Sequence, residues 1–415
     1  MHLLQDLKDF LDNSPTSFHA TEQIANRLAT LDFIPLEEGD KWHLEKGKSY
    51  FVQRNGSIAA FTLPKKTPSR ATILAAHTDS PALKLKPNPK IQKENMTLFG
   101  VEVYGAPLLS SWLNRDLAIA GKIVVISNEG TAEEKLVFLE DAPLIIPQLA
   151  IHLDREVNEK GLVLNKQEHL APIVGLDNHN LEDLLRRYHS FNTLLAFDLF
   201  AIPLEQSRFI GANAEMIASY RIDNLLSAHA CTTAIAKANR ELLNIAFFWD
   251  HEEIGSKTID GANSPFLKEI LNRIAHAYTM NQEDLIRLKT SSLAISIDMA
   301  HALNPNYIAK HDPQHQPLLG KGIVIKYNAD QKYASNAKTA SHIMLLCKNL
   351  SIPYQQYVTR SDTSCGSTVG PIIASTHGIP TVDIGCPQLS MHSIREIAST
   401  QDYLHLVELL TESLR

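Results

Sequence analysis

Two adjacent glutamates, Glu252 and Glu253, stand in the run FFWDHEEIGS (residues 247–256), directly after an apolar stretch. The stretch 245–249 predicts a buried strand. Ionised carboxylates at the end of a buried strand are costly unless a positive group balances them. A metal ion is the usual solution, with one glutamate binding the ion and its neighbour acting on water. For this motif alone, a solvated turn that carries surface acids is the simpler alternative.

The same pattern, an apolar strand followed by His or Asp, recurs along the chain. Residues 73–87 place His77 and Asp79 behind a strand, where the carboxylate can fix the orientation and tautomer of the ring. A third strand, in 293–301, ends in Asp298 with His301 close behind. Two other segments offer candidate ligands before helices: Asp223 in 219–229 and His392 in 387–396. Each histidine taken singly is more often a core or surface group. Together, the histidines and acids suit a pair of borderline metal ions, and neither zinc-finger spacing nor an HExxH motif is present.

The elements that must position these residues alternate between strands and helices. Strands are predicted at 58–63, 72–77 and 293–297, and helices at 224–242 and 264–278, the second with Pro265 near its start. This alternation indicates an α/β fold with a mainly parallel sheet flanked by helices. Ligands in such sheets bind at the carboxyl ends of the strands, where the candidate residues lie.

The length of 415 residues favours two domains. Asp79 and Asp223 lie 144 residues apart, far more than one α/β crossover needs. Between them are β-rich segments at 121–127 and 135–140 and a polar, turn-rich stretch at 166–183. We therefore predict a discontinuous catalytic domain, residues 1–87 plus 208–415, with a β-rich domain inserted at 88–207.

The composition is that of a soluble globular protein, with 44% hydrophobic and 20% charged residues. A net charge of −7 argues against a nucleic-acid partner, which would want a basic face. The N-terminal residues 2–12 have helical apolar spacing rather than a signal-peptide core, and no stretch is long enough to span a membrane. The scattered cysteines predict free thiols and a cytoplasmic protein: Cys231, Cys347, Cys365 and Cys386.

Seven motifs, in this order, resemble those of the aspartyl aminopeptidase family of dizinc metallopeptidases: AHTDSPALKLKP, RIDNL, DHEEIGS, DMAHALNPNY, GIVIKYNADQKYASN, SDTSCGSTVGP and PQLSMHSIRE. The resemblance covers nearly the whole chain, from SPTSFHA (14–20) to MHSIRE (391–396). It implies a metalloaminopeptidase-type fold with an inserted domain that mediates assembly. It also implies a homo-oligomer, with a dimer as the building block and a dodecamer as the larger assembly.

The resemblance assigns roles to the candidate residues. The metal ligands would be His77, Asp223 as the bridge, Glu253, Asp298 and His392. Glu252 would be the general base, Asp79 would orient His77, and His301 would lie near the substrate carbonyl. The family often has a second histidine where this sequence has Asn304. This departure leaves the metal ligands intact but puts one substrate contact in doubt.

Two more residues and one loop receive roles from the resemblance or from their pattern. Lys326 lies in an apolar strand and is either a lysine that extends to solvent or, by resemblance, the group that holds an acidic substrate side chain. His152 is ordinarily a core or interface histidine, but by resemblance it enters a neighbouring subunit's active site. The loop 359–371 either cradles an oxyanion with its N–H groups or caps a helix through Asp362 or Ser364.

The predicted function is that of a cytoplasmic aminopeptidase that removes acidic N-terminal residues, Asp or Glu, from small peptides. Two divalent ions, Zn²⁺ with Co²⁺ or Mn²⁺ as alternatives, would activate the water. One alternative is a deacylase or carboxypeptidase with the same metal centre. The other is a non-catalytic scaffold, which the presence of the base and of all five ligands disfavours. His19, His229 and His251 are interpreted as structural.

Overall fold

The computed structural model describes residues 2–415, which divide into two compact units. The first unit runs to Asp79 and continues through Ser207–Met391 and Glu396–Arg415. The second comprises Ser80–Gln206 and the short segment His392–Arg395. The inserted domain is predicted at 88–207, whereas the second unit starts at Ser80 because the first strand of its sheet begins at Ala82.

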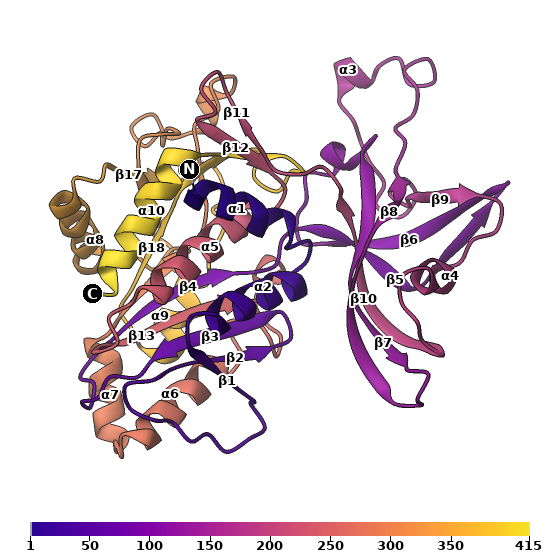
Figure 1. Ribbon diagram of the computed structural model, residues 1–415. Helices are drawn as coiled ribbons and strands as arrows, with labels where there is room; N and C mark the ends of the chain where they lie inside the picture. The colour runs from indigo at the N-terminus through magenta and orange to yellow at the C-terminus, as the bar shows by residue number, and fades with distance from the viewer. Residues whose placement is uncertain (1) are drawn as a thin grey trace. The chain divides into compact units, whose positions relative to one another are not determined.

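Within residues 2–415, nine strands of the first unit form one mixed sheet (Figure 1). In spatial order they are β1 (Phe33–Leu36), β2 (Ser49–Arg54), β3 (Ser57–Thr62), β13 (Leu243–Trp249), β4 (Ala71–His77), β14 (Leu293–Ile297), β18 (Thr381–Gly385), β16 (Ile323–Tyr327) and β17 (Tyr354–Val358). The central strands β13, β4, β14 and β18 are parallel neighbours. The predicted α/β fold with a mainly parallel sheet is therefore confirmed.

Helices cover both faces of this sheet because successive side chains of each buried strand point to opposite sides. On one face, Leu74 and Ala76 of β4 pack with α1 (His2–Asp12), α2 (Ser17–Ala29), α5 (Ile222–Ala236), α8 (Ala337–Leu350) and α10 (Thr400–Ser413). On the other face, Ile73 and Ala75 pack with α6 (Phe266–Ala277), α7 (Gln282–Ser291) and α9 (Gly370–His377). The central strands β13 and β4 are mainly apolar because both of their faces are buried, whereas the edge strand β17 is partly exposed and contains two glutamines.

The predicted elements agree with the structure to within a few residues except at one helix end. The strand predicted at 293–297 is β14, and Pro265 is the N-cap of α6. The helix predicted at 224–242 ends at Ala236, with Lys237 as its C-cap. The chain turns there because the Asn239 side chain accepts a hydrogen bond from the Glu241 N–H, which offers the backbone an alternative to the helix.

A second, smaller sheet of the first unit contains strands that are adjacent in the sequence to two candidate ligands. Its strands, in spatial order, are β11 (Arg208–Ile210), β12 (Met216–Ser219), β20 (Glu396–Ser399), β19 (Pro387–Leu389) and β15 (Ala300–His301). Strand β12 leads into the segment that carries Asp223, and β15 follows Asp298. The two sheets thus fix the backbone on both sides of these residues.

The second unit contains a closed six-stranded barrel in the part of the chain that the structure describes. Its strands, in order around the barrel, are β10 (Thr193–Pro203), β5 (Ala82–Lys93), β6 (Met96–Tyr104), β9 (Ile173–Leu176), β8 (Ala132–Ile145) and β7 (Asp116–Ile126). The stretch 166–183, predicted as turn-rich, also contributes β9 and the start of α4 (Leu181–Arg186).

Two global predictions can be compared with the described residues. None of the helices across 2–415 has the length and apolar character that crossing a membrane requires. All four cysteines are free thiols, and three of them are buried.

Candidate metal centre

The carboxyl ends of three neighbouring parallel strands bring the candidate ligands to one edge of the large sheet. His77 is the last residue of β4, the run Asp250–Glu253 follows β13, and Asp298 follows β14. Since these strands are parallel and adjacent, their ends meet at the same edge. Residues far apart in the sequence therefore become neighbours through the sheet register alone.

His77 lies at the middle of this cluster and is buried. Its Nε2 is 3.5 Å from Asp223 Oδ1 and 3.5 Å from Asp298 Oδ1. Its Nδ1 is 3.1 Å from the Asp79 main-chain carbonyl and 3.4 Å from Asp79 Oδ1. A carbonyl can only accept a hydrogen bond, so Nδ1 carries a proton, and Nε2 is the nitrogen that faces the two other carboxylates, where a proton or a metal cation would balance their charge.

Asp223 is held at the start of α5 by an irregular backbone. Arg221, the N-cap, is in the left-handed region at φ 67°, and Asp223 itself has non-helical dihedrals. The Asp223 N–H donates to Glu396 Oε2 at 2.9 Å, and the next residue, Asn224, donates from its side chain to the Ile297 carbonyl at 2.7 Å. These contacts fix the Asp223 carboxylate beside His77.

The Glu252–Glu253 pair lies in a single 3₁₀ turn, η2 (Glu252–Ile254), directly after β13. The chain enters this turn through His251 at φ 62° and leaves it through Gly255 at φ 93°, a conformation that glycine adopts without strain. The N–H groups of Glu252 and Glu253 donate to the two oxygens of Asp79, each at 3.1 Å. Asp79 therefore both orients His77 and holds the glutamate turn; the second contact was not expected from the sequence.

The electrostatics of the cluster are those of a site that attracts cations. Burial lowers the pKa of His77, but hydrogen bonds to Asp223, Asp298 and Asp79 outweigh it, so the pKa lies well above its usual value. Burial also raises the pKa of Glu252 well above its usual value; the His77 charge opposes this rise, and the charges of Asp298, Glu253 and Asp79 add to it. Without a metal ion, His77 and Glu252 therefore both favour the protonated state, and a bound metal cation would replace a proton.

The donor set fits zinc. Histidine nitrogen and carboxylate oxygen are ligands that zinc accepts. Two donors bound to one ion at about 2.0–2.1 Å lie no more than about 4.2 Å apart, and the 3.5 Å separations at His77 fall within that limit. Two groups of donors within 4.8 Å of one another share His77: one with Asp223 and Asp298, the other with Glu252 and Glu253.

Lys326 lies in β16, between β18 and β17, and is 1% exposed. Its Nζ donates to the Met299 carbonyl at 3.1 Å and lies 3.5 Å from Asp298 Oδ2. The ammonium also faces the Tyr333 ring at 5.1 Å. The alternative in which Lys326 extends to solvent from an edge strand is wrong, because its strand has neighbours on both sides and its charge is neutralised inside the protein.

The remaining predicted residues of the first unit lie in β15 and in two loops. His301, in β15, is exposed, and its ring lies 6.1 Å from that of Tyr357. Asn304 accepts a hydrogen bond from the Asn306 N–H within its own loop. The loop 359–371 leads into α9, whose N-cap is Val369 with no side-chain cap, while Asp362 pairs with Arg360. The helix-cap interpretation of Asp362 and Ser364 is therefore wrong.

His392 and His152 both belong to the second unit. His392 is at φ 66°, and its Nδ1 lies 3.1 Å from the Ala106 carbonyl. His152 is exposed, which excludes the core interpretation. The three histidines interpreted as structural have hydrogen-bond contacts with other side chains: His19 with Thr16, His229 with Tyr403 and Asp6, and His251 with Thr258.

Three residues around the centre were missed by the sequence analysis. Glu396 holds the Asp223 N–H, Arg221 donates from a buried guanidinium to the Thr78 carbonyl at 2.5 Å, and Ser17 donates to Asp250. The signal available was their place inside the motifs MHSIRE, RIDNL and SPTSFHA, since nothing else distinguishes them from ordinary surface or capping residues.

An α/β sheet with histidine and carboxylate donors at its strand ends defines a metal-dependent hydrolase. The sequence matches the aminopeptidase I zinc metalloprotease (M18) family over residues 10–412. The chain therefore belongs to this family, whose members are zinc aminopeptidases, and the resemblance seen in the motifs is confirmed. This membership favours an aminopeptidase over the deacylase, carboxypeptidase and scaffold alternatives.

Individual relatives cover nearly the whole chain. The probable M18 family aminopeptidase 2 of Ectopseudomonas mendocina (strain ymp) is 42% identical over 422 residues, which cover 99% of this chain and 97% of that protein. A chain in the cryo-EM structure of the Ape4 and Nbr1 complex has a TM-score of 0.95 at 33% identity, covering 99% of this chain and 85% of that chain. The S. cerevisiae mApe1 dodecamer has a TM-score of 0.86 at 25% identity, covering 98% of this chain and 95% of that chain.

Proposed function

We propose that this zinc aminopeptidase holds two divalent ions per chain and uses them to remove acidic N-terminal residues from peptides. The observation that carries the two-ion proposal is the position of Asp223. One of its oxygens lies 3.5 Å from His77 Nε2, and a carboxylate oxygen also lies within 4.8 Å of Glu253. These distances support the proposal that Asp223 is shared between a site with His77 and a site with Glu253.

The remaining ligands follow from this division. Asp298 would join His77 and Asp223 at one position, because its Oδ1 faces the same His77 nitrogen. His392, in the motif PQLSMHSIRE, is the further ligand that the family resemblance implies. Zinc is the ion that the family implies, and the same oxygen and nitrogen donors also accept Co²⁺ or Mn²⁺.

Glu252 is the proposed general base. The ions, when bound, polarise the scissile carbonyl and lower the pKa of a water molecule toward neutrality. Glu252 takes the proton of that water and returns it to the nitrogen of the departing peptide. Burial is the largest cause that raises the pKa of Glu252, and a raised pKa favours a carboxylate that accepts a proton and then releases it. Asp79 holds the Glu252 main chain during both steps.

The substrate's free amine and its first side chain would meet groups of opposite charge. The amine would pair with the acidic cluster, which makes the chain end the point of recognition. An acidic side chain would need a cation, and Lys326 lies 3.5 Å from Asp298 at the edge of the same cluster. We assign Lys326 to this role, with His301 near the substrate carbonyl.

A homo-oligomer built from dimers is the proposed assembly. The loop around His152 exposes apolar side chains that a monomer would leave in water, among them Leu153 at 73% and Val163 at 85%. A second copy would cover them, and His152 would then reach the neighbouring active site. The similar S. cerevisiae mApe1 structure is that of a dodecamer, and a dodecamer is the larger assembly that we propose here. The free thiols support a cytoplasmic location.

The variant Glu252→Gln tests the central proposal. It removes the base while keeping the shape of the side chain, so zinc content should stay at about two ions per chain and kcat should fall at least about a hundredfold. Peptides with acidic N-terminal residues, each with a free or an acetylated amine, form the substrate panel. Normal turnover by a zinc-replete variant would remove Glu252 from its role, and cleavage of the acetylated peptides would contradict the exopeptidase assignment.

A further inference from the structure

The first acid of the DHEE motif, Asp250, and the N-terminal segment Ser14–His19 have no part in the mechanism above. Asp250 is 2% exposed, directly precedes His251 and Glu252, and accepts a hydrogen bond from Ser17 Oγ at 3.0 Å. Ser17 begins α2 and is 233 residues away in the sequence. A buried contact over that separation ties the start of the chain to the catalytic turn.

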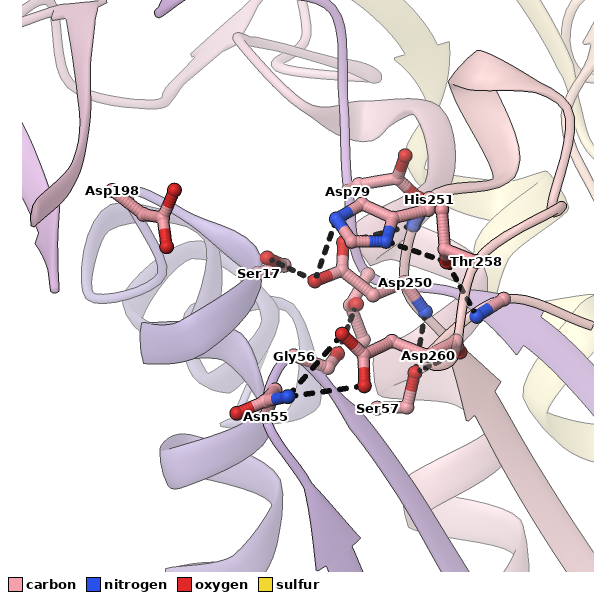
Figure 2. A network of polar contacts seen from close by, with 12 residues as sticks. Ser17, Asn55, Gly56, Ser57, Asp79, Asp198, Asp250, His251, Thr258 and Asp260 are labelled. Atoms are coloured by element: carbon pink, nitrogen blue, oxygen red, sulfur yellow. Dashed lines mark hydrogen bonds and ion pairs between the residues drawn. The ribbon is translucent and has the colours of Figure 1, made fainter. Parts of the chain in front are cut away.

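Both oxygens and the main chain of Asp250 are held (Figure 2). Its Oδ2 accepts the Ser17 hydroxyl, and its Oδ1 accepts the His251 N–H at 2.9 Å. The Asp250 N–H donates to Ser57 Oγ at 2.7 Å. The carboxylate therefore has one orientation, and that orientation is set in part by Ser17.

The Gly56 backbone packs closely against this contact. A Cβ added at Gly56 would lie 1.9 Å from Asp250 Oδ2 and 2.7 Å from Ser17 Oγ. The Gly56 carbonyl also accepts the Thr78 hydroxyl at 2.6 Å. The turn at Gly56 thus packs against both Ser17 and Asp250, next to the strand end that carries His77.

The orientation of Asp250 is transmitted to Glu252 through the backbone. Because Asp250 Oδ1 holds the His251 N–H, it stabilises His251 in the left-handed conformation that turns the chain into η2. From the other side, Asp79 holds the N–H groups of Glu252 and Glu253. Two buried carboxylates thus clamp the four-residue run Asp250–Glu253, and Ser17 anchors one of them.

The same N-terminal segment makes a second contact toward His77. The Arg221 guanidinium donates to the Pro15 carbonyl at 3.1 Å and to the Thr78 carbonyl at 2.5 Å. Thr78 lies between His77 and Asp79, and Arg221 lies two residues before Asp223. One buried cation thus links the N-terminal segment to two of the ligand-bearing motifs.

We propose that the segment Ser14–His19 is a positioning part of the catalytic centre, acting through the Ser17–Asp250 contact on the orientation of Glu252. This inference rests on the proposed role of Glu252 as the base. Ser17 and Asp250 are positioning residues, since neither touches the substrate. The contact matters for the turnover step and not for binding of the peptide end, so its loss lowers kcat and leaves KM unchanged.

The test compares Ser17→Ala, Asp250→Asn, the double variant and a control, Thr411→Val. Ser17 and Thr411 are both 7% exposed, and each donates one hydrogen bond through its hydroxyl, but Thr411 lies in α10 and bonds only to the Val407 carbonyl. Asn at position 250 cannot accept both hydrogen bonds, because its amide nitrogen is a donor. Each protein is measured for kcat, KM, zinc content and thermal midpoint.

Ser17→Ala should lose about ten- to a hundredfold in kcat, the range expected when a catalytic group is misplaced by a fraction of an ångström to about 1 Å. KM, zinc content and thermal midpoint should match those of Thr411→Val. The double variant should be no slower than Asp250→Asn within about twofold, because Ser17 acts only through Asp250. Additive losses, or a Ser17→Ala enzyme as active as the control, overturn the proposal.

The two variants distinguish failure of the positioning role from failure of the proposed function. If Glu252→Gln is inactive while Ser17→Ala behaves like the control, only the positioning role fails. If Glu252→Gln is active, the base assignment fails first. A kcat loss in Ser17→Ala that follows a matching loss of zinc or of thermal stability also overturns the positioning role, because it shows damage to the metal site or the fold.

Discussion

Replacement of Lys326 by Met gives a direct test of how the enzyme selects its substrate. Methionine keeps the length and apolar stem of the lysine side chain in the buried strand β16 but removes the ammonium. That ammonium lies 3.5 Å from Asp298 Oδ2 and donates to the Met299 carbonyl. A substrate carboxylate bound by Lys326 would lose its counter-charge in a site that already contains several carboxylates.

The structure sets the size of the expected effect. At 3.5 Å and an effective dielectric of about 20, two unit charges attract by about 5 kcal/mol, which is an upper bound on the pair. Truncating one partner of a buried charge pair costs about 2–5 kcal/mol. Asp298 shares the ammonium with the substrate, so the lower part of this range applies. Acidic substrates should lose about 30- to 150-fold in kcat/KM, which corresponds to about 2–3 kcal/mol.

The assay is the ratio of kcat/KM for acidic and neutral N-terminal residues, measured on zinc-replete enzyme. The ratio cancels general damage to the fold. Lys332→Met is the matched control, because Lys332 follows the same strand but is exposed. A ratio unchanged by Lys326→Met would refute the specificity role. Equal losses on both substrate classes with altered zinc affinity would instead make Lys326 a residue that orients Asp298.

Two further predictions concern the metal ions. His77→Ala and His392→Ala should each lower the zinc content by about one ion per chain, and Asp223→Ala should weaken both positions, as metal analysis after dialysis would show; unchanged content in all three would overturn the ligand assignment. The raised pKa of His77 means that the metal-free site holds a proton that zinc must displace, so zinc affinity should rise with pH, by up to about tenfold per pH unit for each proton displaced while the pH is below that pKa. Competition with a chelator of known pH dependence measures this slope, and an affinity independent of pH would contradict the proton competition.

The fold was largely accessible from the sequence because its strands are buried on both faces. Continuous apolar runs such as the one that becomes β14 and the helical spacing of α1 are strong local signals. The antiparallel pairs on either side of the central parallel strands could not be predicted, since the direction of strand pairing depends on contacts between distant segments. The start of the second unit at Ser80 was also not predicted. No linker marks this boundary, because β5 begins three residues after the candidate residue Asp79.

The candidate site was predicted as a set of residues but not as a structure. Candidate metal ligands have characteristic residue types, and His77 and Asp298 follow apolar strands while Asp223 precedes an apolar helix, so all three could be selected from the sequence. The contacts that hold them use ordinary groups, such as the Ser17 hydroxyl or the Glu396 carboxylate, and no local pattern marks these. Only the folded chain shows that Asp79 serves two catalytic segments at once.

The hydrogen bond from the Asp223 N–H to Glu396 also has a consequence for biosynthesis. This contact joins residues 173 positions apart, and the Asp79 contact with Glu252 spans a similar separation. A ribosome synthesises the chain from its N-terminus, and a domain can fold completely only after all of its segments have emerged. The Asp223 side of the centre therefore lacks its final support until β20 has emerged. A nascent chain that is still short of β20 therefore lacks the hydrogen bond that holds the Asp223 backbone, so the candidate centre is completed only after that strand has been synthesised.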